Sequence, residues 1–205
     1  MRIVLLGAPA SGKGTQAAFL EARYGIPKIS TGDMLRAARK AGTDLGKEAE
    51  RYMSAGQLVP DEVVIGLVAE RLKDADAQKG FILDGFPRTV AQAEALEAAL
   101  IAAQSPLDCV LQIDVPRELL MERATGRRTD VRTGQIYHLK YNPPPPDAQV
   151  EHRADDQEET VSKRLDAYEA VTAALLPHYT QKNLLKRVDG TGSPAEVTAR
   201  IVAVL

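Results

Sequence analysis

Short apolar segments alternate with stretches of helical periodicity along the whole chain. Residues 3–6 are all apolar and end at Gly7, a pattern typical of a strand buried on both faces of a parallel sheet. Similar segments occupy 27–30, 81–83, 109–113 and 185–188. Helical patterns fill the intervals, at 13–24, 31–54 with a break, 61–73, 89–102, 116–125, 158–183 and 194–204. The alternation predicts an α/β fold with a doubly wound sheet, whose ligand sites lie at the carboxyl ends of the strands.

Two stretches interrupt this alternation. Residues 30–60 contain two short helical patterns and two glycine breaks, at Gly42 and Gly56. Residues 126–156 have no helical periodicity. Their first part is β-prone, and four consecutive prolines follow it at 143–146. Thr133 and Gly134 form a plausible turn there, next to the β-prone Ile136 and Tyr137. A segment of about 30 residues without helix in a compact fold is typical of a lid or binding loop.

Composition and charge narrow the class of protein. The 205 residues are 44% hydrophobic and 26% charged, with a net charge of -2, as in ordinary soluble domains. The charge balance argues against a broadly basic nucleic-acid binder, and no apolar run is long enough to span a membrane. The single cysteine, Cys109, excludes an internal disulfide. Because the apolar stretch at 3–6 is too short for a signal peptide, we expect a cytoplasmic protein.

A glycine-rich loop follows the first predicted strand. Residues 7–15 read Gly-Ala-Pro-Ala-Ser-Gly-Lys-Gly-Thr, and a helical pattern follows. The backbone N–H groups of such a loop converge on phosphate oxygens, and Lys13 would contact the β- and γ-phosphates. The alternative, a glycine-rich turn beside a surface lysine, explains fewer of these features. Gly14 stands where Ser or Thr usually ligates magnesium, so Asp84, at the end of the third strand, is the better candidate to hold Mg²⁺ through water.

Several arginines flank the strand ends and the two interruptions. Arg88 follows the third strand, with Gln92 one helical turn further on, and Arg36 lies one turn into the helix after the second strand. Four more lie at the two ends of the 126–156 segment, namely Arg123, Arg127, Arg153 and Arg164. A single arginine is more often a solvated surface residue. The whole set, with its bidentate phosphate geometry, favours two phosphorylated substrates over one.

With these motifs in place, the sequence resembles the adenylate kinases over essentially its whole length. The motifs are those at 7–15, Ser-Thr-Gly-Asp-Met-Leu-Arg at 30–36, Gly-Gln-Leu-Val at 56–59, Asp-Gly-Phe-Pro-Arg at 84–88, Gly-Arg-Arg at 126–128, Tyr-His at 137–138, Asp-Asp-Gln-Glu-Glu-Thr at 155–160 and Val-Asp-Gly-Thr at 188–191. The resemblance implies a P-loop NTPase fold with a five-stranded parallel sheet in the order 2-3-1-4-5 and helices on both faces. It divides the chain into a core (1–29, 60–125 and 158–205), a mobile AMP-binding insertion (30–59) and a mobile lid (126–157).

The resemblance also implies residue roles. For ATP these fall on Ala10, Ser11, Gly12, Lys13, Gly14, Thr15, Arg123, Arg127, Ile136, Tyr137 and the backbone around Gly192. For AMP they fall on Thr31, Arg36, Gln57, Leu58, Val59, Gly85, Phe86, Pro87, Arg88, Gln92, Arg153 and Arg164. The catalytic set is Lys13, Arg88, Arg123, Arg153 and Arg164.

The implied reaction is the reversible, Mg²⁺-dependent transfer of a phosphoryl group from ATP to AMP, which gives two ADP and balances the adenine nucleotides. The acceptor is a phosphate oxygen that is already ionised at neutral pH, so no general base is required. Positioning and charge neutralisation are what the reaction needs. The expected partners are ATP, AMP and ADP, with no nucleic acid and no membrane, and the family suggests a monomer.

The chain departs from the family pattern at three points. Ala10 stands where the family usually has glycine, and the lid carries four prolines. Many bacterial relatives hold a structural zinc with four lid cysteines, whereas Asp130 and Thr133 occupy the first pair of these positions. We therefore expect no structural zinc, and polar hydrogen bonds in its place.

The two ends of the lid allow two interpretations. Gly126 and residues 155–156 are candidate hinges. They are equally compatible with a helix end at Gly126 and a capping box formed by Asp156 and Glu159.

Three other classes of protein explain the sequence less well. A UMP or CMP kinase shares the phosphate machinery, although Thr31, Gln92 and the long lid favour AMP. A GTPase switch would need a guanine motif of the Asn-Lys-x-Asp type, which is absent. A P-loop enzyme that phosphorylates a small alcohol would need a general base near the acceptor, and the motifs offer no residue for this role.

Overall fold

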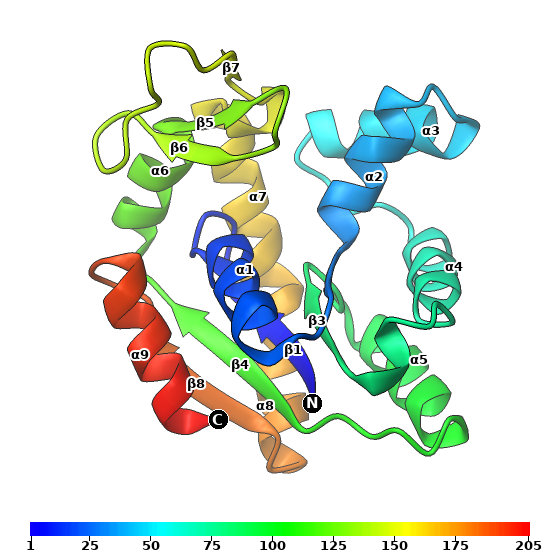
Figure 1. The fold of residues 1–205 in the computed structure, drawn as a ribbon. Helices are drawn as coiled ribbons and strands as arrows, with labels where there is room; N and C mark the ends of the chain where they lie inside the picture. Colours follow the sequence, from blue (N-terminus) through cyan, green and yellow to red (C-terminus); the bar gives the residue numbers. More distant parts are fainter.

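The core of the protein is a five-stranded parallel sheet, seen in a computed structural model that describes all 205 residues (Figure 1). Its strands are β1 (Arg2–Leu6), β2 (Lys28–Ser30), β3 (Phe81–Asp84), β4 (Cys109–Asp114) and β8 (Leu185–Asp189). They lie in the order β2-β3-β1-β4-β8 and are parallel throughout. Because β5 to β7 belong to the lid, β8 is the fifth strand of the core, and the predicted order 2-3-1-4-5 is confirmed.

The register of the strands brings the predicted motifs to one edge of the sheet. Leu5 pairs with Asp84 and with Leu111, and Ser30 also pairs with Asp84. The loops that follow β1, β2 and β3 therefore leave the sheet side by side. These loops carry the glycine-rich motif, the start of the first insertion and the Asp84 motif, so the sheet itself assembles the candidate site.

Helices cover both faces of the sheet. Their bounds are α1 (Lys13–Tyr24), α2 (Thr31–Lys40), α3 (Asp44–Ser54), α4 (Asp61–Arg71), α5 (Val90–Ala102), α6 (Arg117–Thr125), α7 (Glu158–Ala170), α8 (Leu175–Gln181) and α9 (Pro194–Val204). Single 3-10 turns occur at η1 (Ala77–Lys79), η2 (Ala154–Asp156) and η3 (Thr172–Ala174). Helices α1 and α9 have the bounds that the periodicity predicts, and the predicted break in 31–54 separates α2 from α3.

The continuous helix predicted over 158–183 is wrong. Helix α7 ends at Ala170, and η3 separates it from α8. Pro177 explains the interruption, because within a long helix it would lack the N–H for a hydrogen bond and its ring would crowd a carbonyl four residues earlier. In the structure Pro177 lies in the first turn of α8, where proline is tolerated.

Alternate residues of β1 supply two hydrophobic cores. Ile3 and Leu5 pack on one face of the sheet, with residues of α1, α6, α7 and α9. Val4 and Leu6 pack on the other face, with residues of α2, α4, α5 and α8. All four side chains are at most 2% exposed. The continuous apolar run is thus explained, because both faces of the strand are covered.

The first insertion consists of α2 and α3, which pack against each other beyond the edge of the sheet (Figure 1). Ser30 caps α2 by accepting a hydrogen bond from the backbone N–H of Asp33. Gly46 permits the close packing of the pair, because a Cβ there would lie 2.3 Å from the backbone of Ala38.

The lid is a small antiparallel sheet above α6 and α7 (Figure 1). Strand β5 (Arg127–Asp130) lies between β6 (Ile136–His138) and β7 (Val150–Glu151). The predicted turn at 133–134 joins β5 to β6, and the four prolines lie in the connection to β7. Asp130 stabilises the turn, since its Oδ1 accepts hydrogen bonds from the backbone N–H groups of Arg132 (2.8 Å) and Thr133 (3.2 Å).

No group of three or more His, Cys, Asp or Glu side chains is placed to hold a metal ion. Among the helices, none has both the length and the hydropathy that a membrane span requires.

The lid leaves the core at the end of α6 and returns at the start of α7. The two helices pack together, and Arg117 of α6 bonds to Asp166 and Glu169 of α7. Gly126 ends α6, as predicted. The predicted capping box is wrong, because Gln157 is the N-cap of α7 and no side chain caps this helix. Asp156 instead turns into the site, where it meets Arg127.

Candidate functional site

A cavity of about 770 Å³ opens between the sheet edge, the α2–α3 insertion and the lid. All the predicted site residues line it, with the exception of Phe86. The side chain of Phe86 is 1% exposed and belongs to the second hydrophobic core. The family motif around Phe86 therefore combines residues that face the cleft with one that anchors the loop.

The glycine-rich loop places Lys13 at the first turn of α1. Its Nζ donates to the carbonyl oxygens of Gly7 (2.7 Å) and Ala8 (2.8 Å), so the ammonium group lies in the centre of the loop. Burial lowers the pKa of Lys13 to about 8, although the nearby Asp84 carboxylate opposes the shift. The Oγ of Ser11 is buried without a hydrogen-bond partner. The loop thus presents a confined cation and an unused hydroxyl, which are suited to an anion.

Ala10 adopts a left-handed backbone conformation, with φ of 64°. This conformation costs an alanine about 1–2 kcal/mol relative to the right-handed one, whereas glycine adopts it freely. This conformation therefore explains why glycine is usual at this position.

Asp84 lies at the end of β3, beside the glycine-rich loop. A Cβ on Gly14 would lie 3.4 Å from its Oδ2, so the two segments are in close contact. The carboxylate is near the charges of Lys13 and Arg88. Among the predicted residues, Asp84 is the carboxylate placed beside the phosphate loop.

Three cations at the sheet edge bond to backbone carbonyls; we call Lys13, Arg88 and Arg123 the core-edge cations. Arg88 Nε donates to the carbonyl oxygen of Gly85 (2.9 Å), and an Arg123 terminal nitrogen donates to that of Gly190 (3.1 Å). Burial, together with the charge of Arg164, lowers the pKa of Arg88 to about 10. Burial also lowers the pKa of Arg123. None of the three has a carboxylate as its hydrogen-bond partner.

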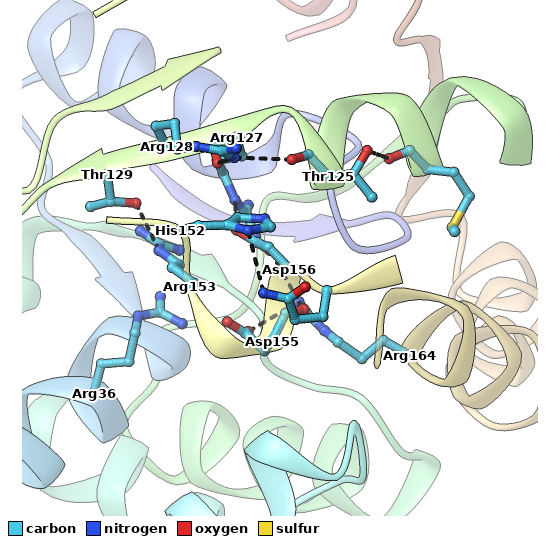
Figure 2. A network of polar contacts seen from close by, with 12 residues as sticks. Arg36, Thr125, Arg127, Arg128, Thr129, His152, Arg153, Asp155, Asp156 and Arg164 are labelled. Carbon is cyan, nitrogen blue, oxygen red and sulfur yellow. Dashed lines mark hydrogen bonds and ion pairs between the residues drawn. The ribbon is translucent and has the colours of Figure 1, made fainter. Parts of the chain in front are cut away.

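The arginines near the base of the lid have a different environment (Figure 2). Arg127 forms a two-pronged ion pair with Asp156, whose side chain is fully buried. Arg164 bonds to the backbone carbonyl (2.8 Å) and the carboxylate (3.0 Å) of Asp155. We call Arg127 and Arg164 the lid-base arginines. Burial opposes the charge on Arg127, but the hydrogen bond and charge of Asp156 outweigh it and raise the pKa of Arg127.

Two further arginines line the same cleft. Arg153 donates from Nε to the Oγ1 of Thr129 (2.9 Å), and burial lowers its pKa to about 10. Arg36 pairs with Asp33 (2.5 Å) and reaches from α2 toward Arg153 and Asp155 (Figure 2). The seven cations singled out in the sequence thus line a single cleft, from the core, the insertion and the lid.

Sequence reasoning did not assign the carboxylates that pair with these arginines. Asp33 has a local signal, since it precedes Arg36 by three positions in a helix. Asp156 has none, because its partner Arg127 is 29 residues away in the chain. His138 and Tyr141 also line the cleft, and their rings lie 4.6 Å apart.

The chain is similar to known adenylate kinases over its whole length. The family model described as adenylate kinase matches residues 5–184. A protein from Sorangium cellulosum named adenylate kinase is 60% identical over 208 residues, which cover 100% of this chain and 96% of the relative. Adenylate kinases from Thermodesulfovibrio yellowstonii (54%; 100% of this chain, 99% of the relative) and Moorella thermoacetica (53%; 97% and 95%) are also similar.

Proposed function

The chain belongs to the adenylate kinase family, and from this we propose that its cleft transfers the γ-phosphoryl group of ATP reversibly to AMP. The observation that carries the proposal is the arrangement of the cleft. A phosphate loop and a second set of cations, which includes Arg36 and Arg88, open into the same cavity. An enzyme with a single phosphorylated substrate would leave the second set without a use. Neither the cleft nor the relatives named above favour a UMP or CMP kinase.

ATP is expected on the side of the phosphate loop. The loop residues 10–15 would surround the phosphates, with Ser11 Oγ and the backbone N–H groups at the start of α1 as donors. Lys13 would exchange its two loop carbonyls for phosphate oxygens. Arg123, Arg127, Ile136 and Tyr137 would contact ATP from the lid side, and the backbone at Gly192 would contact its adenine.

AMP is expected between the α2–α3 insertion and the Asp84 motif. The side chains of Arg36 and Arg88 would bind its phosphate, while Thr31, Gly85, Pro87, Gln92 and residues 57–59 would surround the nucleoside. The Thr31 hydroxyl already joins the two segments, because its Oγ1 donates to the carbonyl oxygen of Gly85 (2.9 Å). Arg153 and Arg164 would lie between the transferring group and the AMP phosphate.

In the transfer itself, a phosphate oxygen of AMP forms a bond to the γ-phosphorus while the bond from that phosphorus to the β-bridging oxygen breaks. The acceptor oxygen carries no proton at neutral pH, so no proton has to be removed. The task of the protein is to hold two polyanions in line and to neutralise their charge. The core-edge cations, Arg153 and Arg164 are suited to this task because burial strengthens their field.

The residues present fit a hydrated magnesium ion. Mg²⁺ keeps several waters and needs few protein ligands beside nucleotide phosphates. Asp84, adjacent to Gly14, would hold such an ion through water, and the absence of a Ser or Thr hydroxyl at position 14 agrees with indirect contact. When bound, Mg²⁺ would neutralise phosphate charge and orient the polyphosphate chain.

Closure of the lid and the insertion over both substrates would exclude water, which otherwise competes as acceptor. The lid joins the core at the C-terminus of α6 and the N-terminus of α7. These two connections suit a segment that moves as a unit. Gly126 has a packing reason as well, since a Cβ there would lie 2.3 Å from His138 Nε2. Hydrogen exchange in the lid should slow when a bisubstrate analogue binds, and unchanged exchange would contradict closure.

A single copy of the chain supplies all the residues proposed for both substrates, so we propose that the monomer is the active form. The decisive experiment is turnover of ATP with AMP, UMP, CMP and GMP in turn, with and without Mg²⁺. We expect ADP formation to require AMP and the metal ion. Equal turnover with UMP or CMP, or ATP hydrolysis that AMP does not stimulate, would contradict the proposal.

A further inference from the structure

Three side chains form a hydrogen-bonded network behind the proposed AMP pocket; we call Asp61, Thr89 and Gln92 the Asp61 network. Gln92 Nε2 donates to Asp61 Oδ1 (2.8 Å), and Thr89 Oγ1 donates to Asp61 Oδ2 (2.8 Å). Gln92 lines the cleft and is only 1% exposed, whereas Asp61 does not line the cleft. Asp61 therefore contacts Gln92 from the side away from the ligand.

The amide of Gln92 has only one orientation that satisfies both neighbours. Its Oε1 accepts a hydrogen bond from the backbone N–H of Arg88 (2.8 Å), while its Nε2 faces the carboxylate of Asp61. An ionised carboxylate can only accept hydrogen bonds, and a backbone N–H can only donate one. A flipped amide would set oxygen against carboxylate and NH₂ against N–H. The two partners thus fix which end of the amide is donor and which is acceptor.

The fixed amide leaves one N–H and one oxygen lone pair for a ligand. Adenine presents the matching pair, an N1 acceptor and an N6 donor, on one edge. A 6-oxopurine presents the reverse pair, an N1–H donor and an O6 acceptor. A site with a fixed hydrogen-bond pattern rejects the reversed pattern because buried polar groups would remain unpaired.

We propose that Asp61 is a positioning residue for base selection, which holds the Gln92 amide in the orientation that accepts adenine and rejects 6-oxopurines. The inference rests on the proposed placement of AMP against Gln92. The location of Asp61 supports a role in holding Gln92 in one orientation. Asp61 is the first residue of α4, where the helix dipole favours a negative charge. Thr89 is the N-cap of α5 and accepts from the backbone N–H of Gln92.

The first test compares AMP with IMP, which differ at the base edge and not at the phosphate. In Gln92→Leu we expect kcat/KM for AMP to fall at least about tenfold. In Asp61→Ala we expect the ratio of kcat/KM for AMP over IMP to fall about tenfold, with KM for ATP unchanged. The double variant should be no worse with AMP than Gln92→Leu alone, because Asp61 acts through Gln92. Asp74→Ala, an exposed carboxylate near the end of the same helix, is the matched control.

The outcomes separate the inference from its premise. An unchanged KM for AMP in Gln92→Leu overturns the placement of AMP, and the inference with it. A clear effect of Gln92→Leu, combined with equal losses for AMP and IMP in Asp61→Ala or with additive losses in the double variant, overturns the inference alone.

If Asp61→Ala folds poorly, a second test exchanges the carboxylate and the amide between positions 61 and 92. Gln92→Glu alone sets two carboxylates together and should lower activity with both nucleotides. In Gln92→Glu combined with Asp61→Asn, the new amide can donate to Glu, whose free oxygen then offers only an acceptor to the base. We expect activity with IMP, whose N1–H can donate to this oxygen, to recover, activity with AMP to stay low, and the AMP-to-IMP ratio to fall about a hundredfold below that of the unchanged chain. Recovery with an unchanged ratio, or no recovery in a folded variant, would count against the inference.

Discussion

The core-edge cations and the lid-base arginines lie in one cleft, but they bond to different kinds of acceptor. Lys13, Arg88 and Arg123 donate to neutral backbone carbonyls of the loops that follow the strands. Arg127 and Arg164 form ion pairs with the carboxylates of Asp156 and Asp155, and Arg164 also donates to the backbone carbonyl of Asp155. Before substrate binds, no hydrogen-bonded carboxylate balances the charge of the core-edge cations. Each lid-base arginine, by contrast, already has a carboxylate partner.

The pKa values reflect this difference for Arg127 but not for Arg164, whose pKa is lowered by burial despite the opposing charge of Asp155. Burial lowers the pKa of Lys13 to about 8 and that of Arg88 to about 10, while the pKa of Arg127 is raised by Asp156 against the effect of burial. A phosphate that meets the core-edge cations relieves an electrostatic cost. At the lid base it must share the arginines with carboxylates or displace them. The core edge is therefore suited to strong anchoring of phosphate, and the lid base to a weaker, reversible contact.

The largest expected effect comes from removing a core-edge cation. Lys13→Ala should lower kcat by about 10²–10³, because a donor aimed at developing charge is lost from a buried site. Steady-state ADP formation measures the effect, and Lys73→Ala, an exposed lysine on the surface, is the control. Thermal unfolding should show that both variants fold. A near-normal kcat in Lys13→Ala would remove the core edge from catalysis.

Removing a carboxylate at the lid base should mainly affect stability. Asp156→Ala leaves Arg127 without its buried partner and should lower the free energy of unfolding by about 3 kcal/mol. Urea unfolding measures the change. Asp166→Ala removes an exposed partner of Arg117 and should cost less than about 1 kcal/mol. Added ATP should stabilise Asp156→Ala more than the unchanged chain, since its phosphates replace the lost carboxylate. Equal losses in the two variants would break the comparison.

The pH dependence of ATP binding should distinguish the two groups. Below pH 8 Lys13 is charged in the empty cleft, and binding requires no proton. Above pH 8 the free protein loses this proton and must regain it on binding, so affinity should fall by up to tenfold per pH unit. Isothermal titration of ATP from pH 7 to 9.5 measures the slope. Lys13→Met should abolish most of it up to about pH 9, because Arg88 and Arg153, with pKa values of about 10, are still largely charged there. A flat profile in the unchanged chain would contradict the assignment to Lys13.

The smallest effect is expected at Ala10, whose left-handed conformation shapes the core edge through the backbone. Ala10→Gly removes the cost of that conformation for alanine but increases the freedom of the unfolded chain. The two terms nearly offset each other, so we expect a gain in stability below about 1 kcal/mol, with little change in ATP affinity. Urea unfolding is again the measurement, and a clear loss of stability would show that alanine is preferred there.

The parts of the fold that local rules determine were predictable from the sequence. The bounds of α1 and α9 follow from periodicity and from glycine or serine at their starts, and the strand order follows from the family motifs. The break between α7 and α8 was missed, although Pro177 signals it. The capping box at Asp156 was wrong for a different reason, because a long-range ion pair with Arg127 outweighs a local cap.

The same distinction applies to the site. Motif residues from Ala10 to Arg164 line the cleft because each follows a strand end or borders an insertion. Phe86 belongs to a motif but packs in the core, since a motif does not specify which way each side chain points. Asp61 lies outside the motifs, and its contact with Gln92 spans 31 residues of sequence, so only the folded chain reveals it.

The packing of α6 against α7 also has an evolutionary consequence. The lid begins where one of these helices ends and finishes where the other begins, and Arg117 bonds the two helices together independently of it. Insertions, deletions or a change in the chemistry that stabilises the lid need not alter the register of either helix. The lid can thus diversify as an exchangeable cassette, and grafting a lid from a relative between Gly126 and Gln157 is a natural route to chimeric enzymes.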